Sequence, residues 1–257
     1  MNFFDSHCHL QDDKIKQRSE QIIQQACTDG VAFMVCCSSC ESDWEDVAVL
    51  ARKWKQVIPA FGIHPWYVTT RTVTWLERLS SYLYEFPGAA VGEIGLDHHH
   101  AADTREEQLE VFTAQLELAA ELKRPVSVHC LKAWGDLLSV FSSKKKLPER
   151  IALHSFSGSV EIIRSMEKMG CYFSCSGAVT HHKNTRIRNL VSAFSSERIL
   201  LETDTPDIPL ENHSGYTVPS LIQQVNAAVA SLRGVDQEMM ASLTFNNACN
   251  CFGVGNG

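Results

Sequence analysis

The sequence predicts one α/β domain folded as a TIM-type (β/α)8 barrel over residues 1–257. Three observations support this fold class: the chain length, eight short apolar runs, and the longer amphipathic stretches that separate them. A chain of 257 residues with 44% hydrophobic content buries a substantial core, and barrels of this class usually occupy about 250 residues as one domain. Strands that alternate with helices at this frequency indicate parallel strands joined by helical crossovers.

The eight apolar runs define the expected strands. In chain order they are residues 2–6, 31–37, 57–61, 89–93, 125–129, 150–154, 171–175 and 198–202. An open, doubly wound sheet also alternates strands with helices. Eight repeats nevertheless favour closure into a barrel.

Local signals indicate two of the expected helices. Thr104-Arg105-Glu106-Glu107 has the Ser/Thr-x-x-Glu form of a capping box at a helix start. The apolar residues that follow recur at spacings of three and four and give one apolar face: Leu109, Phe112, Leu116 and Ala119. A second helix is expected from about Pro219 to Leu232, with its proline suited to a first turn.

Composition and charge argue against several classes of protein. A charged fraction of 21% is ordinary for a globular chain, and no segment approaches the length of a transmembrane helix. A formal net charge of -7 argues against broad attraction to nucleic acid, but it leaves open a nucleic-acid substrate that metal ions hold locally. The cysteines occur in close clusters such as Cys36, Cys37 and Cys40, without a secretory leader. Reduced thiols and a cytoplasmic location are therefore expected.

The most informative fragment lies at the end of the first expected strand, in Phe3-Phe4-Asp5-Ser6-His7-Cys8-His9. Residues i and i+2 of a strand point the same way, so the imidazoles of His7 and His9 can meet one ion. Taken alone, the His-x-His pattern is weak, and unrelated surface or core histidines are an equal alternative. Its position strengthens the metal interpretation, because catalytic groups in parallel barrels come from the carboxyl ends of strands.

Four more candidate ligands follow the same rule: Glu93, His129, His154 and Asp204. The first three close expected strands, and Asp204 lies just past the eighth. Each has a structural alternative: a buried carboxylate paired with a base for Glu93, satisfied core residues for the two histidines, and a turn residue for Asp204. Their coincidence at strand ends favours chemistry. An ionised Asp204 can bind a metal and accept a proton from water.

These residues occur in stretches that resemble the TatD family of metal-dependent deoxyribonucleases, a branch of the amidohydrolase-type TIM barrels. The matching stretches follow the family's order along nearly the whole chain: Asp5-Ser6-His7-Cys8-His9-Leu10, Gly62-Ile63-His64-Pro65, Gly92-Glu93-Ile94-Gly95-Leu96-Asp97, Pro125-Val126-Ser127-Val128-His129, His154-Ser155-Phe156-Ser157-Gly158 and Glu202-Thr203-Asp204-Thr205-Pro206. The tail that begins at Thr244 also looks like the family's closing Thr-x-x-Asn-Ala segment.

Carried over position by position, the resemblance implies two divalent metal ions. His7, His9 and Asp204 hold one ion in this interpretation, and His129 and His154 hold the other. Glu93 bridges the two ions. The implied reaction is hydrolysis of the phosphodiester bonds of DNA by a metal-activated water, with Asp204 as the proton acceptor. Mixed imidazole and carboxylate ligands suit zinc or manganese, whereas the family is associated with magnesium, so the resemblance leaves Mg, Mn and Zn open.

Two further residues are expected at the substrate site. His64 resembles a family position beside the active site where it contacts a substrate phosphate; helix capping or loop packing is an equal alternative. Asp97 is expected near the substrate as an outer carboxylate that orients a ligand. The chain departs from the family at His98-His99-His100, where Tyr is common, at Ser155, where Cys is common, and in residues 211–216, which lack an Arg-Asn pattern. These changes alter the expected pocket rim and affect substrate preference more than hydrolysis. The three histidines are expected in a solvated loop, with metal or phosphate contacts as the alternative.

Two other functions remain open from the sequence. The runner-up is an amidohydrolase-like enzyme that acts on a small-molecule amide, ester or lactone, because the same metal and water chemistry attacks a carbonyl carbon. The third is a binding protein whose metal site serves stability, which the presence of all six candidate ligands disfavours. No membrane association or protein partner follows from the sequence, and a monomer is expected.

Overall fold

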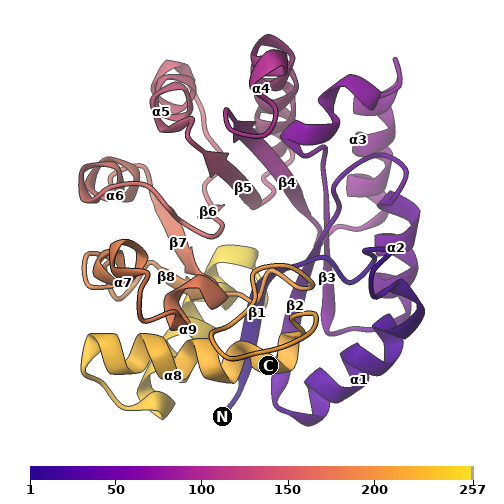
Figure 1. Ribbon diagram of the computed structural model, residues 1–257. Helices are drawn as coiled ribbons and strands as arrows, with labels where there is room; N and C mark the ends of the chain where they lie inside the picture. The colour runs from indigo at the N-terminus through magenta and orange to yellow at the C-terminus, as the bar shows by residue number, and fades with distance from the viewer. Residues whose placement is uncertain (256–257) are drawn as a thin grey trace.

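The computed structural model describes residues 1–255 of the chain. Within them, eight parallel strands form one sheet in the sequential order β1 to β8, and helices on the outside connect successive strands (Figure 1). A doubly wound sheet would instead reverse its strand order at a switch point. The sequential order and the contacts between the first and last strands confirm the predicted (β/α)8 barrel.

The strands are short and the helices that cover them are longer. The strands are β1 (Phe3–Cys8), β2 (Val31–Cys37), β3 (Val57–Phe61), β4 (Ala90–Asp97), β5 (Val126–Leu131), β6 (Ile151–Leu153), β7 (Cys171–Cys175) and β8 (Ile199–Leu201). The α-helices are α1 (Ser19–Thr28), α2 (Trp44–Lys53), α3 (Trp75–Glu85), α4 (Arg105–Glu121), α5 (Trp134–Ser143), α6 (Val160–Glu167), α7 (Thr185–Val191), α8 (Ile222–Arg233) and α9 (Gln237–Phe252). Short 3-10 turns precede several helices, among them η2 (Pro65–Thr70), η3 (Ala102–Thr104) and η5 (Pro219–Leu221).

The strand bounds agree with prediction at β2, β3 and β7, and they differ most at β4. The sequence places the end of this strand at Glu93, but the strand continues to Asp97 after a register shift against β5 between Val91 and Ile94. Gly95 permits this continuation, because it has a φ of +147° and a side chain there would place its Cβ 1.9 Å from the backbone oxygen of His129. Glu93 therefore lies within a strand and Asp97 at its end.

The predicted capping box at the start of α4 is wrong. Thr104 Oγ1 donates to Ala101 O at 3.1 Å and contacts Gln108 Nε2 at 3.1 Å, so the hydroxyl makes no cap bond to the helix. The predicted apolar face is buried at Phe112, Leu116 and Ala119, but it also includes two buried glutamines. Polar side chains are buried on this face because they bind backbone of the strand-end loops.

The second predicted helix is present in two parts. Pro219 begins the 3-10 turn η5, and α8 follows from Ile222 to Arg233. Gly234 then ends α8 in the left-handed conformation with a φ of +64°, as is common after a helix. Proline in the first turn is as the sequence predicts.

The barrel closes between β1 and the chain that follows β8. Ser6 Oγ donates to Leu201 O at 2.9 Å. Beyond the end of β8, Asp204 N donates to His7 O at 3.0 Å and His9 N donates to Thr205 O at 2.7 Å. This seam places Asp204 beside the two N-terminal histidines.

The core has two layers. One layer packs the outer faces of the strands against the surrounding helices. The other fills the inside of the barrel and continues onto α9, where Phe4 stacks on Phe252 with ring centroids 5.8 Å apart. Figure 1 shows α8 and α9 together beside β1 and β8, near both termini. A packed interior of this kind leaves the carboxyl ends of the strands as the place for a site.

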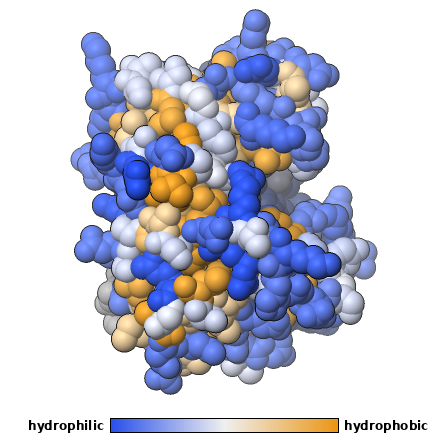
Figure 2. Space-filling model, turned by 60° about the vertical axis from the view of Figure 1, so that its left-hand side comes forward, coloured by the Kyte–Doolittle hydropathy of each residue, from blue (hydrophilic) through white to orange (hydrophobic). Residues whose placement is uncertain are grey.

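The outer surface is mainly polar. Figure 2, which brings the left-hand side of Figure 1 forward, shows mostly hydrophilic side chains with hydrophobic ones gathered near the centre of the face. Across the described part of the chain, no helix combines the length and apolar composition that a membrane span requires. All ten cysteines are free thiols, and most are buried.

Candidate metal centre

Six side chains that the sequence analysis expects to bind metal lie together at the carboxyl ends of five strands. We call this group the His-carboxylate cluster: His7, His9, Glu93, His129, His154 and Asp204. His7 is fully buried and Glu93 is 3% exposed, whereas His9 and His129 are partly open to solvent. The cluster is thus shielded from bulk water on its barrel side and accessible from the mouth.

The two oxygens of Glu93 face different histidines. Glu93 Oε2 lies 3.3 Å from His7 Nε2 and 3.3 Å from His9 Nε2. Glu93 Oε1 lies 3.0 Å from His129 Nδ1 and 3.0 Å from His154 Nε2. One carboxylate therefore stands between two separate pairs of imidazoles, which is the arrangement a bridging ligand needs.

Asp204 belongs to the side of the cluster that contains the N-terminal histidines. Its Oδ1 lies 3.7 Å from His7 Nε2 and 3.6 Å from His9 Nε2. Burial raises the pKa of Asp204, although the charges of His154, His7 and His9 act in the opposite direction. A carboxylate with a raised pKa is a stronger base than an exposed one, which suits proton transfer.

Acceptors behind His9 and His129 fix which ring nitrogen of each faces the cluster with a lone pair. His9 Nδ1 lies 2.8 Å from Cys37 O, which only accepts hydrogen bonds, so in the neutral ring Nδ1 carries the proton and Nε2 faces the cluster with a lone pair. His129 Nε2 lies 3.3 Å from a carboxylate oxygen of Asp97, which leaves Nδ1 facing Glu93. Acceptors of this kind commonly support metal-binding histidines.

His154 and His7 are supported from behind in a similar way. His154 Nδ1 lies 3.3 Å from Glu202 Oε1, and that carboxylate also accepts from Ser155 N at 2.7 Å. The ring of His7 lies against Ser127, with Nδ1 and Oγ 2.9 Å apart. Both rings therefore turn their Nε2 atoms toward Glu93.

His64 lies beside the cluster but has the opposite ring orientation. Its Nδ1 accepts from Trp66 N at 3.2 Å, which caps η2, and its Nε2 lies 3.5 Å from Glu93 Oε1. Burial lowers the pKa of His64 well below its ordinary value, so the ring is neutral. Because Nδ1 accepts, Nε2 carries the proton. His64 is thus suited to donate a hydrogen bond rather than to bind a metal, and the capping alternative is also realised.

Asp97 lies behind His129 and does not face the mouth. It is fully buried and accepts from His99 N at 2.7 Å, from His100 N at 2.8 Å and from Trp66 Nε1 at 2.6 Å. Burial opposes ionisation, but the contacts with His129 and these donors hold the pKa of Asp97 below its ordinary value. A direct substrate contact is therefore not available to Asp97, and its geometry fits the expected role of orienting a ligand.

The charges in the cluster favour a cation at its centre. Burial raises the pKa of Glu93, yet the surrounding histidines outweigh burial and hold it well below its ordinary value. Burial lowers the pKa of His9, but the contact with Glu93 and the charge of Asp204 raise it to about 10. In the metal-free protein the negative charges of Glu93 and Asp204 thus keep His9 protonated. A metal cation at the same position would balance these charges instead.

The donor set fits divalent ions. The Nε2 atoms of His7 and His9 are 3.1 Å apart, and two lone pairs directed at one point repel unless a cation or a proton lies between them. Three groups of side chains lie close enough together to hold a metal ion: His7 with His9 and Asp204, His7 with His154 and Glu202, and His64 with Glu93 and His129. In the third group the bond from Trp66 N to His64 Nδ1 leaves the proton on Nε2, so His64 offers no lone pair there. Imidazole and carboxylate donors together suit zinc, manganese and related ions.

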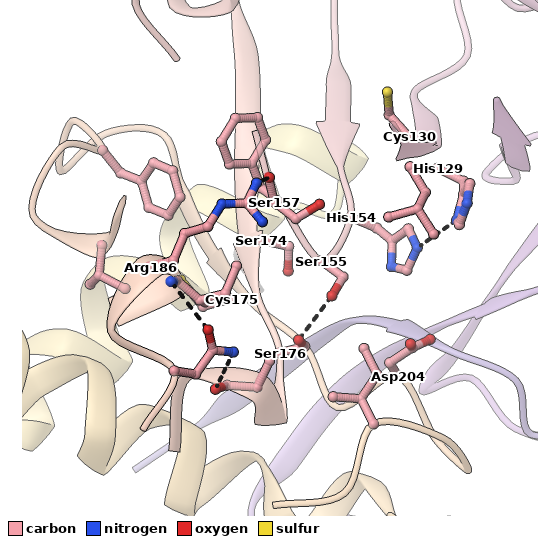
Figure 3. Close-up of a pocket in the computed structure, with 18 residues that line it drawn as sticks. His129, Cys130, His154, Ser155, Ser157, Ser174, Cys175, Ser176, Arg186 and Asp204 are labelled. Carbon is pink, nitrogen blue, oxygen red and sulfur yellow. Dashed lines mark hydrogen bonds between the residues drawn. The ribbon is translucent and has the colours of Figure 1, made fainter. Parts of the chain in front are cut away.

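A cavity of about 410 Å³ adjoins the cluster on the side of β5 to β8. Figure 3 shows His129, His154 and Asp204 at one edge of this cavity and Arg186 at the other. Ser155 and Ser176 line it between these edges, with their hydroxyl oxygens 3.0 Å apart. The serine that occupies the position where the family commonly has cysteine thus forms part of the wall.

Sequence reasoning missed the residues that hold the cluster from behind. Glu202 is fully buried next to His154, and its spacing of two from Asp204 is the same signal that joined His7 to His9. Gln108 holds the backbone of Asp97 through bonds of 2.8 and 3.0 Å. Gln115 holds Ile63, next to His64, through bonds of 2.7 and 3.2 Å. No local pattern identifies the two glutamines, because their partners lie on another element.

A (β/α)8 barrel with histidines and carboxylates gathered at the carboxyl ends of its strands defines the class of metal-dependent hydrolases of this fold. A family model described as TatD related DNase matches residues 4–253. The chain therefore belongs to the TatD family, and it is a metal-dependent hydrolase. This membership confirms the family that the sequence motifs resemble.

Relatives match the chain over nearly its full length. The uncharacterized metal-dependent hydrolase YabD of Bacillus subtilis is 28% identical over 98% of this chain and 99% of its own. The 3'-5' ssDNA/RNA exonuclease TatD of Cronobacter sakazakii is 29% identical over 97% of both chains. The crystal structure of the TatD homologue YjjV from Escherichia coli has a TM-score of 0.92 at 28% identity and covers 98% of each chain.

Proposed function

We propose that this protein is a deoxyribonuclease that hydrolyses phosphodiester bonds with two divalent metal ions. The observation that carries the proposal is that the two carboxylate oxygens of Glu93 face two different pairs of histidines. The similarity to a relative named as an exonuclease on single-stranded DNA and RNA supports a nucleic-acid substrate. The proposed setting is the cytoplasm, in keeping with ten free thiols, and the proposed form is a monomer.

The proposed ligands divide at Glu93. His7, His9 and Asp204 would hold one ion, His129 and His154 would hold the other, and Glu93 would contribute to both. Divalent ions in such a pair, when bound, neutralise charge on the phosphoryl oxygens and lower the pKa of water.

The chain's own groups position the substrate and move the proton. Asp204 accepts the proton of the attacking water, because its carboxylate lies at the cluster beside His7 and His9. His64 donates a hydrogen bond from its Nε2–H to a phosphoryl oxygen, since its Nδ1 accepts from Trp66 N. Asp97 keeps the ring of His129 in place from behind. These roles assign proton acceptance, substrate orientation and ligand orientation to separate residues.

The proposal is tested with the purified full chain, freed of metal and then given magnesium, manganese or zinc. We expect cleavage of labelled single- or double-stranded DNA with at least one ion. Glu93→Gln and Asp204→Asn should each lower the rate well over tenfold while the fold persists, and the exposed Glu197→Gln serves as the matched control. Absence of DNA cleavage with every ion, together with turnover of a carbonyl substrate, would overturn the nuclease assignment.

The cavity beside His129 and His154 favours a second candidate, hydrolysis of a small-molecule amide, ester or lactone. Its volume of about 410 Å³ and its partly apolar wall, which includes Phe156 and Phe194, match what small-molecule sites usually provide. The two candidates share the metal chemistry and differ in the atom attacked. A panel of carbonyl esters and lactones, run beside the DNA assay with the same metals, separates them by relative kcat/KM.

A further inference from the structure

An exposed tryptophan stands at the mouth beside the His-carboxylate cluster. Trp66 lies in η2, two residues after His64, and 49% of its surface is open to solvent. Tryptophan seldom leaves so much surface exposed without a partner. An aromatic face next to a candidate active site is a contact surface for a substrate with a flat ring.

The indole of Trp66 is held in place by its polar and aromatic neighbours. Its Nε1 donates to Asp97 Oδ2 at 2.6 Å. The rings of His64 and His100 meet it edge to face, with centroids 4.9 and 5.2 Å away. A side chain fixed in this way loses little conformational entropy when a ligand stacks on it.

One cationic group lies at the same rim, on the far side of His99. The ammonium of Lys132 lies 3.0 Å from His99 Nδ1, whose ring is 4.5 Å from that of His100. None of the lysine or arginine ion pairs among residues 1–255 includes Lys132. His99 and His100 are both exposed. In a chain whose formal net charge is -7, a cation without a carboxylate partner at the same rim as an exposed aromatic side chain favours a ligand that combines a ring with a negative charge.

We infer that the indole of Trp66, with His100 packed edge to face against it, is a platform on which one base of a single-stranded nucleic acid stacks, while Lys132 contacts the adjoining phosphate. This inference rests on the proposed nuclease function and adds a base-binding subsite to it. Duplex bases are covered by their neighbours, so only an unpaired base offers its face to Trp66. The platform therefore favours single strands over duplexes.

Binding is measured by fluorescence anisotropy of a short labelled single strand, with manganese and in an Asp204→Asn background that leaves the strand uncleaved. We expect Trp66→Ala to weaken binding by about fivefold or more, the loss typical of one base stacked on an aromatic ring. Trp66→Phe retains a ring but lacks the indole N–H, so it should stay within about twofold of the parent. Tyr84→Ala, which removes an aromatic that is 68% exposed on α3, is the matched control.

A second strand that lacks bases isolates the stacking contact. This abasic strand should bind the parent weakly, and Trp66→Ala should change its affinity no more than Tyr84→Ala does. Lys132→Gln should reduce the dependence of binding on salt by about one phosphate contact on both strands.

The outcomes separate failure of the platform from failure of the nuclease. If the wild-type chain cleaves DNA but Trp66→Ala binds the single strand as tightly as Tyr84→Ala, the platform is wrong and the nuclease stands. If Trp66→Phe loses as much as Trp66→Ala, or the loss persists on the abasic strand, the indole acts by positioning Asp97 and stacking is refuted. If the wild-type chain neither binds nor cleaves any strand, both proposals fail.

Discussion

Glu202 offers a test of the structure that the sequence motifs alone do not supply. Its carboxylate is fully buried, lies 3.3 Å from His154 Nδ1 and also accepts from Ser155 N at 2.7 Å. Glu202→Gln retains the shape of the side chain and removes its charge. Loss of such an outer partner typically lowers metal affinity by about 10- to 100-fold.

This loss converts into a change in thermal stability. A 10- to 100-fold weaker affinity corresponds to about 1.4 to 2.8 kcal/mol of binding free energy. At a metal concentration that saturates both proteins, the same difference appears in the free energy of unfolding. In a chain of this size each kcal/mol moves the Tm by about 2 to 4 °C. The metal-dependent rise in Tm should therefore be about 3 to 11 °C smaller in Glu202→Gln than in wild type.

The assay is differential scanning calorimetry with and without manganese or zinc, paired with titration calorimetry for the metal affinity. Glu197→Gln removes an exposed carboxylate near β8 and should behave as wild type. If Glu202→Gln binds metal with wild-type affinity while Glu93→Gln does not, then His154 needs no charged partner, and our account of how the histidines are oriented is refuted.

Three further predictions concern the proton acceptor, the barrel wall and pH. Asp204→Asn should lower kcat by about 100-fold or more without unfolding the protein; circular dichroism checks the fold, and retention of full activity would remove Asp204 as the base. Gly95→Ala should lower the free energy of unfolding by about 3 kcal/mol, because its Cβ would lie 1.9 Å from His129 O. Gly88→Ala, which meets no atom within 4 Å, is its control in chemical denaturation. The pKa of His9 is raised to about 10 in the metal-free protein, so a metal that binds His9 must displace a proton. The affinity for the metal should therefore rise about tenfold per pH unit between pH 7 and 9. Titration calorimetry in buffers of different ionisation enthalpy measures the proton release, and finding none would contradict this prediction.

The bounds of a strand could be predicted from the sequence where the strand is one continuous run of apolar residues. Residues 57–61 and 171–175 are strands with those bounds and are buried on both faces, and residues 31–37 are buried except for two partly buried residues near the start. β4 runs four residues further than predicted, to Asp97, because pairing with β5 continues the strand through its glycines. Sequence periodicity cannot report such pairing, since the partner strand lies elsewhere in the chain.

In the site, too, the sequence predicts the residues that local motifs identify but not the partners that packing brings from distant elements. The six members of the His-carboxylate cluster follow from residue type at strand ends, and the structure brings all of them together. Their supporting partners do not follow from it. Ser127 reaches His7 from β5, and Gln108 reaches Asp97 from α4, because packing sets these contacts. The direction of each ring, and hence the different role proposed for His64, became visible only with these partners.

The position of the cluster at the closing seam of the barrel links metal binding to folding. His7 lies near the end of β1 and His9 directly follows it, whereas Asp204 follows β8, at the other end of the sheet order. Asp204 N donates to His7 O, and His9 N donates to Thr205 O, so the same hydrogen bonds that close the barrel bring these side chains together. An open barrel would separate Asp204 from both histidines. With the proposed ligands, metal bound by these three residues would stabilise only the closed form, and by mass action it would favour closure over any state in which the seam is open.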